Sequence, residues 1–232
     1  MHSTWTKYVF LVLVLTGLPG CITDSDKSRR PGQIRDVDGN VYHTITIGNQ
    51  VWMAEDLKTT RYNDGTPIPR VENYDEWAEL TLPAYSWYNN DSVYREDFGA
   101  LYNYYAVESG KLCPEGWHVP SDEDWIALET RLGGASNAGG ALKEAGTVHW
   151  KTPNTGASNE SGFTALPGGY RSYNGTFNWM RTYGLWWSAT EKSWYGGPPK
   201  VIYRDLRYDG QDIRRNISEK NSGLLVRCIK NP

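Results

Sequence analysis

The chain has 232 residues, of which 24 are Lys or Arg and 27 are Asp or Glu, so its formal net charge at pH 7 is −3. Its basic runs are no longer than KSRR at 27–30, so it lacks the clustered positive charge that a nucleic-acid-binding surface needs. The 11 Trp and 16 Tyr far outnumber the 4 Phe, which favours rings that carry a hydrogen-bonding group.

Residues 1–20 have the pattern of an export signal. Lys7 precedes an apolar run from Tyr8 to Leu18, and this order of charged and apolar regions is typical of such signals. The run is too short to cross a bilayer, because a membrane-spanning helix needs about 20 apolar residues. We therefore predict that residues 1–20 direct the chain out of the cytoplasm.

The signal ends in LPGC, which is similar to the processing site of bacterial lipoproteins. In that pattern Cys21 is lipidated and becomes the new N-terminus. Pro19 departs from the pattern, and a secretory signal cleaved nearby is the alternative. Ile22 differs from the aspartate that retains many lipoproteins at the inner membrane. We predict a lipid anchor on Cys21 that attaches the protein to the outer membrane or cell surface.

The remaining chain divides into a polar tether and one domain. Residues 21–33 contain polar residues with Pro-Gly and no apolar periodicity, which is typical of a flexible tether. Residues 34–232 are enough for a single domain with a core. Alternation within 41–47 predicts an N-terminal β-hairpin. His43 falls in phase with the apolar positions, so we predict that it faces the core.

Residues 59–99 are irregular and rich in Asn, Asp, Pro and Tyr. The segments YNDG at 62–65 and YNNDS at 88–92 offer clustered oxygens that suit calcium. The same residues are the usual ones for turns, and neither segment matches the full EF-hand pattern. We predict no metal and no cofactor.

Two short helices follow. Ser121 is a predicted N-cap, with Asp124 in the position of the capping-box acid, and the first helix ends at Gly133. A second helix is predicted over 139–144. The remainder indicates short strands and long loops, in which alternation within 201–208 places Tyr203 on the face opposite Arg204. The fold class is therefore α+β.

Besides Cys21, the chain contains Cys113 and Cys228. An exported protein lies in a compartment that permits oxidation, so we predict a disulfide between these two residues. The alternatives are two free thiols, or a nucleophilic Cys113 with His118 as its base.

Several motifs resemble one protein family in their order along the chain. They are GNQVWMAEDLKTTRYNDGTPIP, FGALYNYYAV, LCPEGWHVPSDEDW, ESGFTALPGGYRS, LWWSAT and GLLVRCIK, and they span about 34 to 230. These motifs are similar to the Fibrobacter succinogenes major paralogous domain, found in secreted and lipid-anchored bacterial proteins. The resemblance implies a C-type lectin-like fold with an N-terminal β-hairpin, two short helices, long irregular loops and short antiparallel strands.

The family supplies no activity, so we predict from the residues a non-catalytic recognition or adhesion module. Its partner would be a polysaccharide or another surface polymer, or a surface protein, because exposed aromatic faces stack on sugars and on partner side chains. In a strand, adjacent residues face opposite sides, so one of Trp186 and Trp187 is expected to be buried. The predicted binding residues are Arg171, Tyr173, Trp179, Tyr183, Trp186 and Trp187.

Sugar-binding C-type lectins chelate calcium and sugar through a Glu-Pro-Asn or Gln-Pro-Asp loop and a Trp-Asn-Asp motif. This chain has TPN at 152–154 and WSA at 187–189, which argues against that route. An alternative is a relative of the formylglycine-generating enzymes, which HVPSDEDWIALETRLGG resembles. Those enzymes need a pair of cysteines close together near the C-terminus, and only Cys228 lies there. A purely structural envelope protein is the third possibility.

Overall fold

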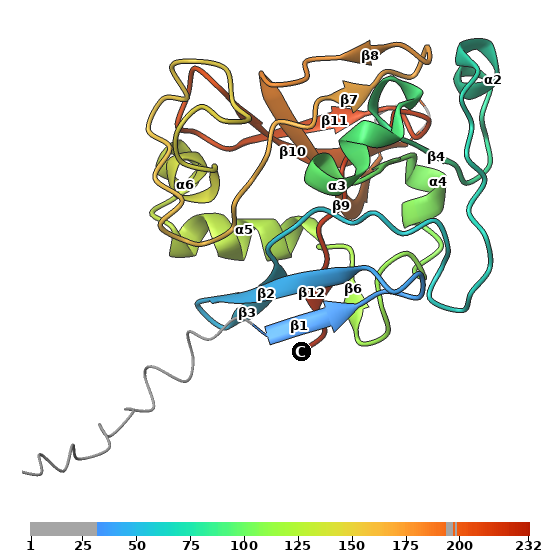
Figure 1. Ribbon diagram of the computed structural model, residues 1–232. Coiled ribbons are helices and arrows are strands. Elements are labelled where there is room, and N and C mark those ends of the chain that lie inside the picture. The colour runs from blue at the N-terminus through green and yellow to red at the C-terminus, as the bar shows by residue number, and fades with distance from the viewer. Residues whose placement is uncertain (1–31, 194–196, 198) are drawn as a thin grey trace, which may run out of the picture.

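The computed structural model describes residues 32–193, 197 and 199–232 (Figure 1). The predicted signal over 1–20, the lipidation site Cys21 and most of the predicted tether lie outside the described residues. The first strand begins at Gly32, two residues before the predicted start of the domain. Within the described ranges, no helix is both long and apolar enough to cross a membrane.

The first sheet contains both ends of the described chain. Its five strands lie in the order β1-β2-β3-β12-β6, and all neighbours are antiparallel. The strands are β1 (Gly32–Arg35), β2 (Val41–Ile47), β3 (Gln50–Met53), β6 (Trp117–His118) and β12 (Ile229–Lys230). The predicted N-terminal hairpin is confirmed, and the last strand lies between β3 and β6.

The prediction that His43 faces the core is wrong. Tyr42 is buried instead, because its hydroxyl donates to Asp36 Oδ2 at 2.6 Å and accepts from the Lys58 amide at 3.0 Å. His43 therefore points to solvent, where its Nδ1 lies 2.7 Å from Glu55 Oε1. The burial along β2 does not keep one phase, because Tyr42 is buried near its start and Ile47 at its end.

The second sheet has three antiparallel strands in the order β11-β10-β9. They are β9 (Tyr183–Lys192), β10 (Lys200–Arg207) and β11 (Arg214–Ser218). Arg204 projects from one face and donates to Asp122 at the start of α5. Tyr203 lies on the opposite face of β10, as its neighbouring position in the strand requires. The expected alternation in this strand is therefore confirmed.

Helix α5 (Asp122–Arg131) begins with the predicted capping box. Ser121 Oγ accepts from the Asp124 amide at 3.1 Å, and Asp124 Oδ2 accepts from the Ser121 amide at 2.8 Å. Helix α6 spans Ala135–Leu142 rather than 139–144. It begins earlier because Gly134, with φ of 85°, turns the chain directly into it.

Several short elements connect these parts. The chain therefore forms more short helices than the two that were predicted. The single-turn helices are α2 (Tyr74–Ala78), α3 (Arg95–Phe98) and α4 (Tyr104–Val107), with 3₁₀ turns at Tyr88–Asn90 and Ser92–Tyr94. Two further sheets have two antiparallel strands each. One pairs β4 (Tyr85–Ser86) with β5 (Leu101–Tyr102), and the other pairs β7 (Tyr170–Arg171) with β8 (Phe177–Asn178). The molecule is mixed α and β, with strands predominating.

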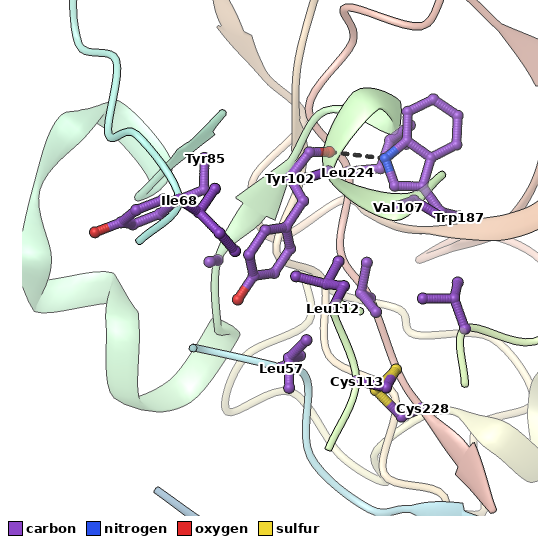
Figure 2. Close-up of a cluster of buried hydrophobic side chains, with 14 of the residues drawn as sticks. Leu57, Ile68, Tyr85, Tyr102, Val107, Leu112, Cys113, Trp187, Leu224 and Cys228 are labelled. Carbon is purple, nitrogen blue, oxygen red and sulfur yellow. Dashed lines mark hydrogen bonds between the residues drawn. A yellow bond between two sulfur atoms is a disulfide. The ribbon is translucent and has the colours of Figure 1, made fainter. Parts of the chain in front are cut away.

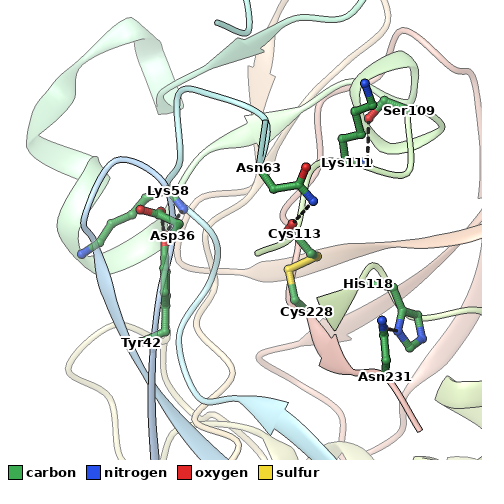
Figure 3. Close-up of a disulfide and its surroundings, with 10 residues drawn as sticks. All are labelled: Asp36, Tyr42, Lys58, Asn63, Ser109, Lys111, Cys113, His118, Cys228 and Asn231. Atoms are coloured by element: carbon green, nitrogen blue, oxygen red, sulfur yellow. Dashed lines mark hydrogen bonds between the residues drawn. A yellow bond between two sulfur atoms is a disulfide. The ribbon is translucent and has the colours of Figure 1, made fainter. Parts of the chain in front are cut away.

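The predicted disulfide between Cys113 and Cys228 is confirmed (Figures 2 and 3). Both cysteines are buried in the larger apolar cluster, near Leu57 and Leu112. The carbonyl oxygen of Cys113 accepts a hydrogen bond from Asn63 Nδ2 at 3.0 Å (Figure 3). The bond joins the segment before α5 to the segment before β12, so it ties the last strand to the middle of the chain.

Candidate functional site

Two of the six predicted binding residues, Trp186 and Trp187, lie wholly inside the protein. Both are 0% exposed, and each indole N–H has an internal acceptor. Trp186 Nε1 donates to Asp56 Oδ1 at 2.8 Å, and Trp187 Nε1 donates to the Tyr102 carbonyl at 2.7 Å (Figure 2). The prediction that they bind a ligand, and that one of them is exposed, is wrong because the chain covers both faces of β9.

Arg171, the third of these residues, is also 0% exposed and cannot contact a ligand at the surface. Its guanidinium lies 4.1 Å from the centre of the Trp77 ring and 4.8 Å from that of Phe177. It donates to the carbonyl oxygens of Val71, Glu72, Asn73 and Gly175. Burial lowers its pKa to about 10. Arg171 therefore fastens the hairpin of β7 and β8 to the loop before α2.

The other three predicted residues are accessible. Trp179 is 47% exposed and Tyr173 is 57% exposed, while Tyr183 is half-buried. The Trp179 ring contacts two tyrosines, with ring centroids 4.8 Å from Tyr170 and 4.6 Å from Tyr183. These contacts orient the indole without covering it. The chain thus presents an aromatic ring of fixed position to solvent.

The backbone at Trp179 has a conformation that side chains rarely adopt. Its φ is 67°, and Arg181 two residues later has φ of 66°. Positive φ is costly for a bulky residue, and such positions concentrate at functional sites. Here the turn is held by hydrogen bonds from the amides of Thr182 and Tyr183 to the Trp179 carbonyl, each at 3.0 Å. The strain is therefore maintained by the surrounding structure.

A shallow pocket of about 170 Å³ lies beside Trp179. We call it the aromatic pocket. It is formed between the hairpin of β7 and β8 and the face of the second sheet that is opposite to α5. Four aromatic, three hydroxyl and two aliphatic side chains line it: Tyr170, Tyr173, Trp179, Tyr203, Ser172, Ser218, Ser222, Leu185 and Leu224.

Apart from the indole N–H of Trp179, the polar side-chain groups of the aromatic pocket are all hydroxyls. Ser218 Oγ donates to Ser222 Oγ at 2.9 Å, and the Tyr170 hydroxyl is hydrogen bonded to Ser172. Burial raises the pKa of Tyr203 to about 12. Its phenol therefore keeps its proton at neutral pH and can both donate and accept. None of the nine lining residues carries a charged side chain.

A second cavity, of about 480 Å³, lies near the C-terminus and contains His118, Asp124 and Asn231. It is larger than the aromatic pocket, and these three polar side chains bond to one another. His118 Nδ1 lies 2.7 Å from Asn231 Oδ1 (Figure 3), and Nε2 lies 3.3 Å from Asp124 Oδ2. Asp124 is also the capping-box acid. Because Cys113 is bonded to Cys228, it cannot serve as a thiolate nucleophile for His118.

The segments considered for calcium have other partners. Asp64 of the YNDG segment pairs with Lys111 Nζ at 2.9 Å and accepts from the Thr66 amide. Asp91 of the YNNDS segment accepts from the amide of Val93. Across the residues that the structure describes, no three His, Cys, Asp or Glu side chains form a group that could hold a metal.

Tyr170, Tyr203 and the three serines were missed by the reasoning from sequence. Alternation in β10 correctly placed Tyr203 opposite Arg204, but nothing in the sequence pattern brings that face against the hairpin of β7 and β8. The bridge from Gly169 to Gly184 and the bridge from Arg171 to Gly223 create that approach. Both are contacts between segments distant in sequence.

Comparison with known proteins identifies the family. The model of the Fibrobacter succinogenes major domain matches residues 45–230. The chain therefore belongs to the Fibrobacter succinogenes major domain family, as its motifs predicted. Neither the curated proteins nor the solved structures contain a match to the chain.

Proposed function

We propose that this protein is a non-catalytic recognition module of the bacterial cell envelope, with the aromatic pocket as its ligand site. The observation that carries the proposal is Trp179, which is 47% exposed, has φ of 67° and is held by ring contacts with Tyr170 and Tyr183. An exposed indole in a strained conformation contributes little to folding. Its position beside a pocket supports a role in binding.

The site is also organised before a ligand arrives. Gly169, at the start of the hairpin, has φ of 63°, and a Cβ there would lie 2.5 Å from the Asn178 carbonyl oxygen. Arg171 joins the same hairpin to the loop before α2. Because these contacts fix the hairpin in the free protein, little conformational entropy is lost when a ligand binds.

Lipid anchoring at Cys21 and location at the outer membrane or cell surface are part of the proposal. The described chain begins at Gly32 and ends at Pro232, and both lie at the end of the molecule formed by the first sheet (Figure 1). Strands β7, β8 and β11 lie at the opposite end (Figure 1). An anchor before Gly32 would thus leave the aromatic pocket turned away from the membrane.

We further propose that the domain has a C-type lectin-like fold. Three features support this: the N-terminal and C-terminal strands share one sheet, α5 and α6 follow one another, and a long loop region precedes the second sheet. The disulfide joins the segment before α5 to the segment before the last strand. The calcium motifs of sugar-binding lectins are replaced here, and Asn154 of TPN donates to the carbonyls of Glu144 and Gly146.

The proposed lack of catalysis rests on the same disulfide. A relative of the formylglycine-generating enzymes would use redox-active cysteines, and within the described ranges both cysteines are bonded to each other. The bond is buried in the core rather than placed in a cavity. A structural role for the disulfide accounts for both residues.

Binding to envelope and plant cell-wall polymers tests the proposal. The purified protein would be attached to beads through its C-terminus and mixed with polysaccharides and with surface proteins. We expect retention of a polymer by the wild type and its loss in Trp179→Ala. Ile126 on α5 is 46% exposed and lies on the other side of the second sheet, so Ile126→Ala is the matched control. Equal retention by Trp179→Ala would refute the proposed site.

A further inference from the structure

From the chemistry of the aromatic pocket we infer that the ligand is an uncharged sugar ring, part of a neutral polysaccharide. This inference rests on the proposed function and names the class of ligand that the same site takes. It depends on three properties of the lining: the lack of charge, the pairing of exposed aromatic faces with hydroxyl groups, and the small volume.

The lack of charge argues against acidic and basic ligands. No Asp, Glu, Lys or Arg is among the lining residues. The ionised groups that act on Tyr203 are Asp205 and Arg214, and they already pair, with Arg214 Nε donating to Asp205 Oδ1 at 2.7 Å. A charged sugar would lose water in the pocket without gaining a partner of opposite charge, which is unfavourable.

Two further ionised residues near the pocket are also paired. Glu219 and Lys220 follow Ser218 in the chain. Lys200 Nζ bonds to Glu219, and Lys220 Nζ lies 2.7 Å from Glu108 and 2.7 Å from Glu191. The pair of Lys200 and Glu219 is neutral, and Lys220 with its two glutamates leaves one net negative charge. The field around the aromatic pocket therefore offers no attraction for an acidic ligand.

The mixed lining suits a sugar better than an apolar group. Each face of a pyranose presents C–H groups that pack on an aromatic ring, while its rim carries hydroxyls. Here Trp179 and Tyr173 supply exposed faces, and Ser172, Ser218 and Tyr203 supply groups that both donate and accept. An apolar peptide side chain would leave those hydroxyls without new partners, whereas sugar hydroxyls replace the water they lose.

The volume suits a single ring. Pockets for drug-sized ligands measure about 300 to 1,000 Å³, and the aromatic pocket measures about 170 Å³. A single ring therefore occupies the pocket while the rest of the polymer continues along the surface. One stacked ring gives modest affinity, so we expect many weak contacts along a polymer rather than tight binding of a monosaccharide.

The test measures binding of three polymer classes at neutral pH by affinity electrophoresis: a neutral glucan or xylan, a polyuronate, and a denatured protein. We expect the neutral polymer to retard the wild type. Trp179→Ala should weaken this binding at least tenfold and Tyr203→Phe severalfold, while Ile126→Ala leaves it unchanged. Raising salt from 50 to 500 mM should have no effect, because screening acts on charged contacts, and a chelator should have none.

The outcomes separate the two proposals. Binding to polyuronate or protein alone, lost in Trp179→Ala, would overturn the neutral-sugar inference and leave the proposed function standing. If Trp179→Ala still binds the neutral polymer as the wild type does, the aromatic pocket is not the binding site. If no polymer binds in a way that depends on Trp179, both proposals fail. Superimposable urea unfolding curves of the variants and the wild type would show that the fold is intact.

Discussion

The rings of Trp179 and Tyr183 lie with their centroids 4.6 Å apart and their planes inclined by 32°. This contact supports the indole on one side and leaves the ring 47% exposed. Tyr183 is the first residue of β9, and the same strand carries Trp186 and Trp187, three and four positions further on, both buried in the core. Neighbouring tryptophans of one segment therefore have opposite roles, one at the surface and two in the core.

We predict that this difference is visible in stability. Trp186→Ala removes a fully buried ring and a donor to Asp56, so it should lower the free energy of unfolding by about 4 kcal/mol. Trp179→Ala should change it by less than about 1 kcal/mol, because about half of this residue is already in water. Urea unfolding followed by circular dichroism measures both. Similar losses in the two variants would contradict the assignment of Trp179 to a surface role.

Arg171→Met should destabilise the protein by about 4 kcal/mol. Methionine keeps the apolar stem but leaves the carbonyl oxygens that Arg171 bonds to without donors in a buried place. The hairpin would also lose its attachment to the loop before α2, so binding through the aromatic pocket should weaken as well. Urea unfolding and the polymer assay are the two measurements.

The control for this substitution is Arg61→Met. The Arg61 side chain is 50% exposed, and its Nε lies 3.4 Å from Asp38 Oδ1. An exposed ion pair contributes little, so we expect a change within about 1 kcal/mol. An Arg171→Met variant no less stable than Arg61→Met would show that the buried guanidinium does not hold the hairpin.

Reduction of the disulfide should cost about 5 kcal/mol. The bond closes a loop with a sequence separation of 115 residues, and the chain-entropy model assigns that stabilisation to the restricted unfolded chain. The double variant Cys113→Ala and Cys228→Ala should unfold at a correspondingly lower urea concentration with or without dithiothreitol. The wild type should move to that midpoint only when reduced. An unchanged midpoint after complete reduction, checked by thiol titration, would contradict the prediction.

Stability should fall in acid because of Asp122. Hydrogen bonds from Arg215, and then from Arg204, hold the pKa of this carboxyl below its usual value although burial opposes them. A carboxyl with a lowered pKa in the folded state contributes its full stabilisation above about pH 4 and loses it as the pH falls through the folded pKa. Urea unfolding at pH 7, 5, 4 and 3 should show this loss.

Asp122→Asn provides the comparison for the acid effect. It should be less stable at pH 7 by about 3 kcal/mol, since Arg204 is buried and loses a charged partner. Between pH 4 and 3 its free energy of unfolding should fall less than that of the wild type. Asp75→Asn on α2 removes an exposed carboxylate and should leave the pH dependence as it is. If the free energy of unfolding depends on pH in the same way in the wild type and in Asp122→Asn, groups other than Asp122 cause the loss of stability in acid.

The local signals of the sequence predicted the start of α5 and the disulfide. Ser121 and Asp124 form a capping box because both partners lie within one helical turn, so no distant contact is needed. The pairing of Cys113 with Cys228 followed from the number of cysteines and the compartment. Properties that depend on few residues, or on composition, can be predicted from sequence alone.

The binding residues were predicted only in part, because burial depends on contacts between distant segments. The Trp186 indole donates to Asp56, and the Trp187 ring packs against Tyr104, so residues from other parts of the chain cover both faces of β9. Alternation along a strand says which residues share a face, but not whether that face is covered. Trp179 lies in the turn between β8 and β9, outside both strands, and is exposed there.

The position of β12 between β3 and β6 has a practical consequence. Since the first and last strands belong to one sheet, the two ends of the domain can be joined or extended without crossing the opposite end of the molecule, where β7 and β8 lie (Figure 1). A circular permutant that links Pro232 to Gly32 through a short flexible connection should therefore keep its fold. New termini could then be opened in an exposed loop of choice, which makes this domain a scaffold for displaying a small binding surface.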